Sequence, residues 1–451
     1  MIHLLLWHHI SHAAAFEQNP LGGIWGSPAL KSPHAAWWNP AMLPAHRTSL
    51  VLGGGIQMGQ LNVEAPQNSQ RYTGIGPMAH FGAVTQISRI RLGFSSGIPY
   101  ALSGQSQSKP DYFLNSARIA IASHNLAIAT ALQNWTFGFG TNIYQASWQS
   151  SLRSDGLYDY AQSIRATGLL PSYTDAQLMQ EAYAIDIEID GQDHGVGFGF
   201  GLAYQSETWR FGLAGNLAPT LNMSGQTVLT FYCPPESDPM AKENAQDLGL
   251  CNQKYTGQGR HLLPLPHRFH VAAHHQKSER QTLWLAIGTV RWERYQDFEL
   301  ILSDFTEDPE SQSFIEKPRP WARNLNPSYW IQLGTDHQFS NWISHFRIGM
   351  DSPSVPKEAM NPNNSDSLSI SSMGGISHRV AMQEHQKWTI GIAANVSYRL
   401  PRQIDTSLFS LSVDEPVLES RYRWPNAEGR YTGYVAGLEA YIRYSPTSSP
   451  L

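Results

Sequence analysis

Apolar side chains occupy every second position of residues 388–399, and small or polar residues fill the positions between them. A strand with this pattern presents one apolar face and one mixed face, as strands do that separate lipid from a lumen. Residues 342–351 and 434–444 repeat the pattern. Residues 281–292 are apolar on both faces, which a wide water-filled pore would not need. The alternation therefore predicts a membrane β-barrel with an apolar lumen.

Fourteen segments read as strands, and two kinds of connection separate them. The segments are 48–63, 77–87, 90–101, 112–131, 135–149, 184–205, 208–232, 267–277, 281–298, 327–339, 342–351, 367–380, 387–400 and 430–444. Tight polar turns alternate with long connections such as 150–183 and 233–266, which are expected to be outward loops. This sorting is typical of bacterial outer-membrane barrels, whereas a large secreted β protein has no reason for it. We therefore expect an all-β fold, a 14-stranded antiparallel transmembrane β-barrel over residues 47–451, closed by pairing of the first strand with 430–444.

Residues 16–46 are apolar in part but cannot form a strand. Pro40 and Pro44 each remove a backbone donor and fix φ, and the adjacent Trp37 and Trp38 need burial. A segment of this kind survives inside something larger. We expect it to be an N-terminal hatch (plug) in the barrel lumen.

A run of four glycines at every second position, Gly195 to Gly201, suggests a partner for the hatch. The run resembles a nucleotide-binding loop only superficially, because no helix follows it to bind a phosphate. The glycines share one face of a strand and leave room for another backbone, such as the hatch. A bend in the barrel without any packing partner would explain them equally well.

Composition narrows the class of protein further. Charged residues make up 15% of the 451 residues and aromatic residues 11%. The charge content is below the roughly 25% of soluble domains, and no apolar run approaches the ~18 residues of a membrane helix. The net charge of −5, without a basic stripe, argues against a nucleic-acid partner. These values fit a protein of the Gram-negative outer membrane. We expect it to be in contact with outer-membrane lipid or detergent and to be monomeric.

The N-terminal residues 1–15 form at most a short signal segment. Leu4 to Leu6 make a very short apolar run, and Ala13 to Ala15 resemble a cleavage site for a signal peptidase. A truncated signal peptide is therefore expected here.

Two cysteines, Cys233 and Cys251, lie in one expected outward loop and enclose an acidic stretch. In an oxidising compartment such a pair forms a disulfide. Closing a loop of this size contributes about 3 kcal/mol on a chain-entropy estimate. We therefore expect a disulfide on the outer side of the barrel.

The sequence offers little for catalysis or metal binding. His270 and His274 fall on one face of a strand, but nothing points to a third metal ligand, so we interpret them as lumenal or interfacial polar residues. No serine elbow, HExxH motif or catalytic carboxylate pair is present. We expect neither an enzyme nor a cofactor. A membrane enzyme with a site assembled from distant strands is the minor alternative.

The segment 90–101 contains Gly93, Gly97 and Pro99 close together. Proline cannot donate to a strand ladder and glycine permits a bend, so this cluster predicts a local gap in the barrel wall. The alternative is a bulge at the rim, where the strand ends.

Four short motifs, in order along the chain, resemble one known family. They are Ala36-Trp37-Trp38-Asn39-Pro40-Ala41, Gly97-Ile98-Pro99-Tyr100, the block from Phe346 to Pro356 that contains Arg347, Gly349, Pro353 and Val355, and Arg430-Tyr431-Thr432-Gly433. The chain resembles the outer-membrane long-chain fatty-acid and aromatic hydrocarbon transporter family (FadL/TodX type) from about Phe16 to Tyr444. It departs from the family pattern at Lys31 and His34, where acidic residues are usual, and at its end, which is not phenylalanine.

The resemblance implies passive uptake of a hydrophobic small molecule, a fatty acid or a hydrocarbon. The ligand would meet the hatch at residues 37–41 and leave sideways into the bilayer through the wall near Gly93, Gly97 and Pro99. A fatty acid would need a lumenal cation, and strand parity offers Arg347, Arg399 and Arg443. Two other classes stay open: a barrel used as a surface anchor or adhesin, and a general porin.

Overall fold

The structure is a computed structural model of the chain. It describes residues 27–44, 48–64, 69–106, 114–155, 184–233, 242–243, 246, 251–305, 319–322, 324–360, 365–383, 386–405 and 428–446. The expected signal segment 1–15 and most of the expected loop 150–183 lie outside these residues.

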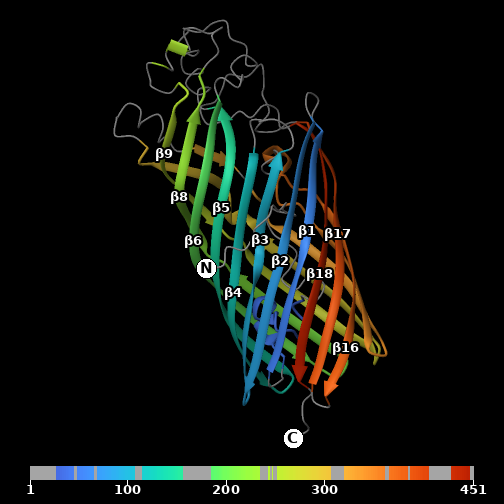
Figure 1. Ribbon diagram of the computed structural model, residues 1–451. Helices are drawn as coiled ribbons and strands as arrows, with labels where there is room; N and C mark the ends of the chain where they lie inside the picture. Colours follow the sequence, from blue (N-terminus) through green and yellow to red (C-terminus); the bar gives the residue numbers. More distant parts are fainter. Residues whose placement is uncertain are drawn as a thin grey trace.

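The described strands form a closed antiparallel barrel of fourteen strands, as predicted (Figure 1). The segments are β1 (Thr48–Glu64), β2 (Ser69–Ile87), β3 (Ile90–Ser106), β4 (Leu114–Leu132), β5 (Trp135–Asp155), β6 (Ala184–Gln205), β7 (Trp209–Leu217), β8 (Thr220–Phe231), β9 (Lys254–Pro264), β10 (His267–Ser278), β11 (Gln281–Arg291), β12 (Asp297–Ser303), β13 (Arg319–Ala322), β14 (Ser328–Phe339), β15 (Trp342–Asp351), β16 (Ser369–Gln383), β17 (Gln386–Ile404) and β18 (Gly429–Pro446). Four barrel strands consist of two segments each: β7 with β8, β9 with β10, β11 with β12, and β13 with β14. The barrel closes where β1 pairs with β18, with Leu50 opposite Tyr444.

The strands run further than the sequence predicts. β9 lies inside the range expected to be the loop 233–266, and β5 continues to Asp155 inside the range expected to be the loop 150–183. The expected strand 281–298 is also wrong in detail, because a 3-10 turn, η4 (Trp292–Arg294), separates β11 from β12. The strands extend beyond the residues that alternate in the sequence, because their outer segments still form ladders, such as those of β9 with β8 and with β12.

Two of the interruptions share one stabilising side chain. Proline at 219 and at 266 cannot donate to a ladder, so the wall breaks beside Ala218 and Leu265. Arg294 of η4 donates from the same Nη1 to the carbonyl oxygens of Ala218 and Leu265, at 2.8 and 2.5 Å. The guanidinium thereby satisfies two carbonyls that the broken ladders leave without strand partners.

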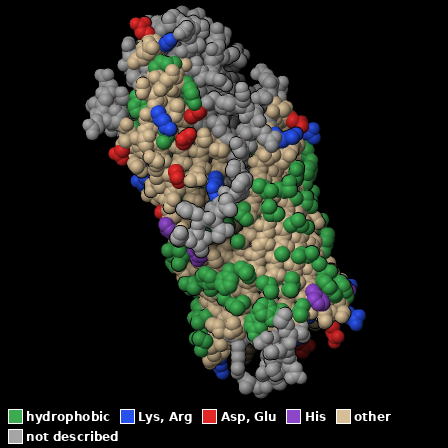
Figure 2. Space-filling model, viewed as in Figure 1, with side chains coloured by type: hydrophobic (Ala, Val, Ile, Leu, Met, Phe, Trp, Pro, Cys, Tyr) green, Lys and Arg blue, Asp and Glu red, His purple; other side chains and the backbone are tan. Residues whose placement is uncertain are grey.

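The outer surface of the barrel carries the apolar face of the strands. Ile390, Ile392 and Val396 of β17 are exposed, as are Phe346 and Ile348 of β15. Figure 2 shows hydrophobic side chains over the lower part of the barrel, with charged side chains above them and at the lower tip. In the outer membrane these side chains face lipid rather than water. The predicted alternation is confirmed for these strands.

Short turns lie at one end of the barrel, between β2 and β3, β4 and β5, β10 and β11, and β14 and β15. In bacterial outer-membrane barrels this end faces the periplasm. The hatch residues lie inside the lower part of the barrel in Figure 1, as a four-residue helix α1 (Ala35–Trp38) and a 3-10 turn η2 (Pro40–Met42). A third 3-10 turn, η5 (Lys357–Ala359), follows β15. Among the described residues, no helix is long and apolar enough to cross a membrane.

Candidate functional site

Asn39 organises the hatch. Its backbone is extended, with φ of −159°, and separates α1 from η2. Its Oδ1 accepts a hydrogen bond from the Ala41 amide at 3.1 Å, which caps η2, and Pro40 provides the fixed φ suited to the first helical position. Its Nδ2 donates to the carbonyl oxygens of Pro28 and Leu202, at 2.7 and 3.4 Å. One side chain therefore joins two turns of the hatch to the wall.

The wall is hollowed by glycine where the hatch approaches it. A β-carbon on Gly201 of β6 would overlap Asn39 Oδ1, and one on Gly138 of β5 would overlap the peptide between Pro40 and Ala41. The last glycine of the run in β6 therefore faces the hatch. Gly195, at the other end of that run, instead faces side chains of the β7–β8 region, as its β-carbon would contact Leu221 and Pro219.

Wall side chains donate to the carbonyl oxygens of the hatch. Asn216 of β7 donates to the Trp37 carbonyl at 3.0 Å, and His270 Nε2 of β10 lies 2.6 Å from the Trp38 carbonyl oxygen. Arg91 of β3 donates to the Leu43 carbonyl at 3.1 Å. The irregular hatch leaves these carbonyls without helical partners, so the wall satisfies them. His270, which we interpret from the sequence as a lumenal or interfacial polar residue, therefore contacts the hatch.

A line of three titratable side chains crosses from the hatch to the barrel seam. His34 Nε2 lies 2.8 Å from Nδ1 of His80 on β2, and His80 Nε2 contacts Glu439 of β18. His34 also lies 3.4 Å from the Ser32 hydroxyl. Burial, with His80 and Arg443 nearby, holds the pKa of His34 well below its usual range. His34 is therefore neutral at neutral pH while the hatch is in place.

The two tryptophans of the hatch are fully buried and face different groups. Trp37 packs edge-to-face against Tyr144 of β5, with ring centroids 6.3 Å apart. The guanidinium of Arg268 lies 5.9 Å from the ring centroid of each tryptophan. Cations at this distance from an indole face are attracted to it.

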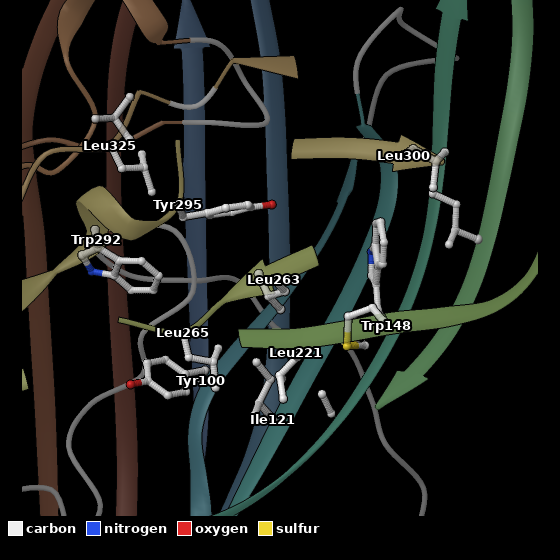
Figure 3. Close-up of a cluster of buried hydrophobic side chains, with 14 of the residues drawn as sticks. Tyr100, Ile121, Trp148, Leu221, Leu263, Leu265, Trp292, Tyr295, Leu300 and Leu325 are labelled. Atoms are coloured by element: carbon white, nitrogen blue, oxygen red, sulfur yellow. The ribbon is translucent and has the colours of Figure 1, made fainter. Parts of the chain in front are cut away.

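An apolar lumen begins at Trp37 and continues toward the end opposite the short turns. Tyr100, Ile121, Leu221, Leu263 and Trp292 line part of it (Figure 3). Tyr100 and Trp292 meet edge-to-face at 6.2 Å between ring centroids.

The buried polar atoms of this region without a hydrogen-bond partner among the described residues include Trp37 Nε1 and the Tyr100 hydroxyl. Leaving a buried donor unpaired costs about 1–3 kcal/mol. Apolar side chains therefore fill this part of the lumen, and few of its described polar atoms lie unpaired.

The ladder between β2 and β3 is interrupted beside this lumen. Thr73 pairs with Gln105 and His80 with Gly97, but residues 74–79 and 98–104, all within the described strands, have no β2–β3 pairs between them. On the other side, β3 has a register shift between Gly97 and Tyr100. Pro99 lies within the break, Gly97 at its edge, and Gly93 outside it, paired with Val84 and Ala127.

The structure separates the three arginines that strand parity groups together. Arg347 and Arg443 line one cavity on the short-turn side of the hatch. Arg399 donates to the Ser365 carbonyl at 3.3 Å and does not line that cavity. Arg347 pairs with Asp336 at 2.7 Å and lies 4.2 Å from the ring centroid of Trp284. Among the described residues, no group of three or more His, Cys, Asp or Glu could hold a metal ion.

Cys233 and Cys251 form a disulfide, as the sequence predicts, with Cα atoms 4.5 Å apart. Cys233 follows β8 and Cys251 precedes β9, so the bond closes the connection between two paired segments.

Sequence reasoning missed several residues that hold the hatch: Arg268, Asn216, His80 and Glu439. Strand parity places each on the inner face, so a polar residue at an inward position was the available signal. Parity alone does not tell which inward residues reach the hatch.

A family profile decides the identity. The family described as "Outer membrane protein transport protein (OMPP1/FadL/TodX)" matches residues 26–360, which include most of the hatch, the β2–β3 break and the disulfide. The chain belongs to this family. It is an outer-membrane protein of the FadL/TodX type, a family of hydrophobic-compound transporters.

Solved structures agree on the fold. A FadL homologue of Pseudomonas aeruginosa is 15% identical, with 98% of this chain and 99% of that one covered and a TM-score of 0.73. The CymD monoaromatic hydrocarbon channel is 14% identical, with 97% and 99% covered and a TM-score of 0.63. The toluene transporter TodX of Pseudomonas putida is 12% identical, with 98% and 99% covered and a TM-score of 0.61. No curated protein sequence matches the chain.

Proposed function

We propose that the protein is a passive, monomeric channel for hydrophobic small molecules, long-chain fatty acids or aromatic hydrocarbons, which releases them sideways into the bilayer. The observation that carries the proposal is the position of the β2–β3 break, which adjoins the apolar lumen. Tyr100, fully buried in that lumen, follows Pro99 directly. A ligand beside Tyr100 would thus be next to a part of the wall that has no ladder between β2 and β3.

Solvation gives the ligand its direction of travel. An apolar solute gains about 0.8 kcal/mol per methylene buried, so it favours the lumen over water and the bilayer equally well. The way to the periplasm leads past the hatch and its hydrogen bonds to the wall. The sideways route avoids both water and those bonds.

The similar solved structures do not decide between the two ligand classes, fatty acids and aromatic hydrocarbons. CymD and TodX are described as carrying monoaromatic hydrocarbons and toluene, whereas a FadL homologue has the highest TM-score of those compared here. The unpaired Trp37 Nε1 and Tyr100 hydroxyl would suit a ligand with an oxygen atom. Extraction of the protein with its native lipids, followed by mass spectrometry, identifies the cargo.

Two other functions make different demands on the same features. A surface anchor or adhesin needs no hatch fastened by the side chains of several strands. A general porin needs a continuous wet lumen, which the apolar cluster around Trp37 and Tyr100 does not offer.

The test replaces Gly97 and Pro99 with valine, which favours strand pairing. Uptake of a radiolabelled fatty acid and of toluene by cells lacking their own transporters should be lost, with the amount of folded, heat-modifiable protein unchanged. The matched control is Gly374→Ala in β16, where a β-carbon would have no neighbour within 4 Å. Unchanged uptake in the Gly97/Pro99 variant would mean that the ligand leaves by another path.

A further inference from the structure

A second compartment lies on the periplasmic side of the hatch. It is a cavity of about 730 Å³. Leu30, Ser32 and His34 of the hatch line one wall. The opposite wall consists of inward residues near the short turns, including Arg280, Gln338, Arg379, Lys387 and Ser445.

The cavity and the apolar lumen lie at opposite ends of the same strands. In β1, Val51 lines the cavity, whereas Leu61 and Val63 belong to the apolar cluster. In β18, Arg443 lines the cavity and Tyr431 belongs to the cluster. The hatch lies between the two compartments, so the inner surface changes from apolar to charged across it.

Cations outnumber acids in the cavity. Five cationic side chains line it, and they are Arg280, Arg347, Arg379, Lys387 and Arg443. The acidic side chains are two, Glu279 and Asp336. Asp336 is already engaged, at 2.7 Å from Arg347 and 3.0 Å from His345. The lining therefore carries three more positive than negative charges.

The contacts of these cations leave them available to a ligand. Among the described residues, Arg347 is the one of the five with an ion pair to a carboxylate. Arg379 donates to the neutral amide of Gln338 at 3.1 Å, and Arg443 donates to the Ser445 hydroxyl at 3.2 Å. Arg347 is the exception, because it is 3% exposed and its Nη1 also donates to the carbonyl oxygens of Thr335 and Phe346, at 3.0 and 2.8 Å.

The positive potential extends into the hatch. Burial, with the positive charges of Arg210 and Arg91 on the wall as smaller causes, lowers the pKa of Lys31, next to the cavity residue Ser32, to about 8. A buried ammonium loses its proton more easily where other cations surround it and anions are lacking.

We propose that this cavity is an oxyanion site, open to the periplasmic side, that binds the carboxylate of a hydrophobic acid or a phosphate. Guanidinium groups, an ammonium and hydroxyls from Ser32, Ser377 and Thr389 are the donors that such anions prefer. The apolar side chains of Leu30, Val51 and Ile343 provide room for a short alkyl chain. Binding here requires no passage through the lumen, so the site does not depend on the proposed transport.

The test measures binding to the full-length protein in a non-ionic detergent at low ionic strength. Equilibrium dialysis with radiolabelled hexanoate and, separately, inorganic phosphate should give one bound anion per protein. Hexan-1-ol is the neutral comparison, and protein-free micelles correct for partitioning. The variant Arg379→Gln/Lys387→Gln removes two exposed cations at the cavity and should weaken anion binding by about tenfold, because each exposed charge contributes modestly to the binding of an anion.

The matched control is Arg89→Gln/Lys277→Gln. These two exposed cations lie at the same end of the barrel but do not line the cavity, so affinity should be retained. Binding of hexanoate alone would identify a carboxylate with an alkyl chain as the ligand, and binding of phosphate alone would identify a phosphate. The proposal is overturned if neither anion binds, if hexan-1-ol binds as tightly as hexanoate, or if both double variants bind alike.

Discussion

Asn39 Oδ1 lies where a β-carbon on Gly201 would stand. The hatch and the wall are therefore complementary in shape at the atom that also caps η2. The family motif and the glycine run of β6, which lie far apart in the sequence, form one fitted contact.

Gly201→Ala should displace the hatch, because the new methyl group overlaps Asn39 and the Gly201 backbone cannot move out of its ladder with β5 and β7. The measurement uses Ala36→Cys as a reporter, since Ala36 is fully buried and both native cysteines are bonded. Maleimide should label the reporter slowly in the parent and rapidly with Gly201→Ala. Gly374→Ala is the control and should leave labelling slow; equal rates for all three proteins would contradict the fit.

Acid should loosen the hatch through His34. The docked imidazole has a lowered pKa, whereas a released one has the ordinary value near 6.5. Above pH 6.5 both forms are neutral and docking is unaffected. As the pH falls below 6.5, the released form gains a proton and is favoured by up to 1.36 kcal/mol per pH unit, until the docked pKa is reached.

Between pH 6.5 and 5 the shift is at most about 2 kcal/mol, or roughly 30-fold in the population of released hatch. The Ala36→Cys labelling rate, divided by the rate of the denatured protein at the same pH, should rise accordingly. His34→Gln keeps a polar side chain facing Ser32 and His80, carries no proton near Arg443, and should remove the pH dependence. A pH profile identical in both proteins would assign the effect to another group.

Arg347→Met should destabilise the barrel by about 2 kcal/mol. Breaking a buried ion pair typically costs 3–5 kcal/mol, and the partial exposure of Asp336 reduces that cost. The denaturant midpoint of the heat-modifiable form provides the measurement. Adding Asp336→Asn removes the carboxylate that is left with His345 alone and should recover part of the loss; a double variant less stable than Arg347→Met would argue against the pair.

The disulfide should be present without added oxidant, because the outer leaflet faces an oxidising environment. Thiol titration of the denatured, unreduced protein should find no free thiol. The variant Cys233→Ser/Cys251→Ser should loosen the connection between β8 and β9 by about 3 kcal/mol on the chain-entropy estimate, since the cysteines are 18 positions apart in the sequence. Faster proteolysis within 234–250, with an intact barrel, is the expected result.

The sequence predicted the parts of the fold that depend on local pattern. The alternation in β15, β17 and β18 gave their faces correctly, because one face of each meets lipid and the other does not. It did not predict β9, whose exposed face carries polar residues such as Gln258 and Arg260, or the interruption at η4, where the wall is broken. Parity predicted inward positions for Arg347, Arg399 and Arg443, but not that Arg347 and Arg443 line the cavity on the periplasmic side of the hatch, because position along a strand relative to the hatch depends on barrel tilt and register.

No single stretch of sequence contains more than one of His34, His80 and Glu439. Barrel closure brings His80 close to Glu439, and docking of the hatch brings His34 to His80.

The short link between the hatch and β1 restricts how the hatch could ever open. Leu43 is fastened by Arg91, and β1 begins at Thr48, so five peptide units join a buried anchor to the wall. Fully extended, they span about 18 Å at most. If the hydrogen bond between Arg91 and the Leu43 carbonyl breaks, Leu43 can still move no further than this distance from Thr48. The hatch must then open by rotating about its C-terminal end near Leu43, so that Pro28 and Leu30 move furthest. It does not leave the barrel as a whole.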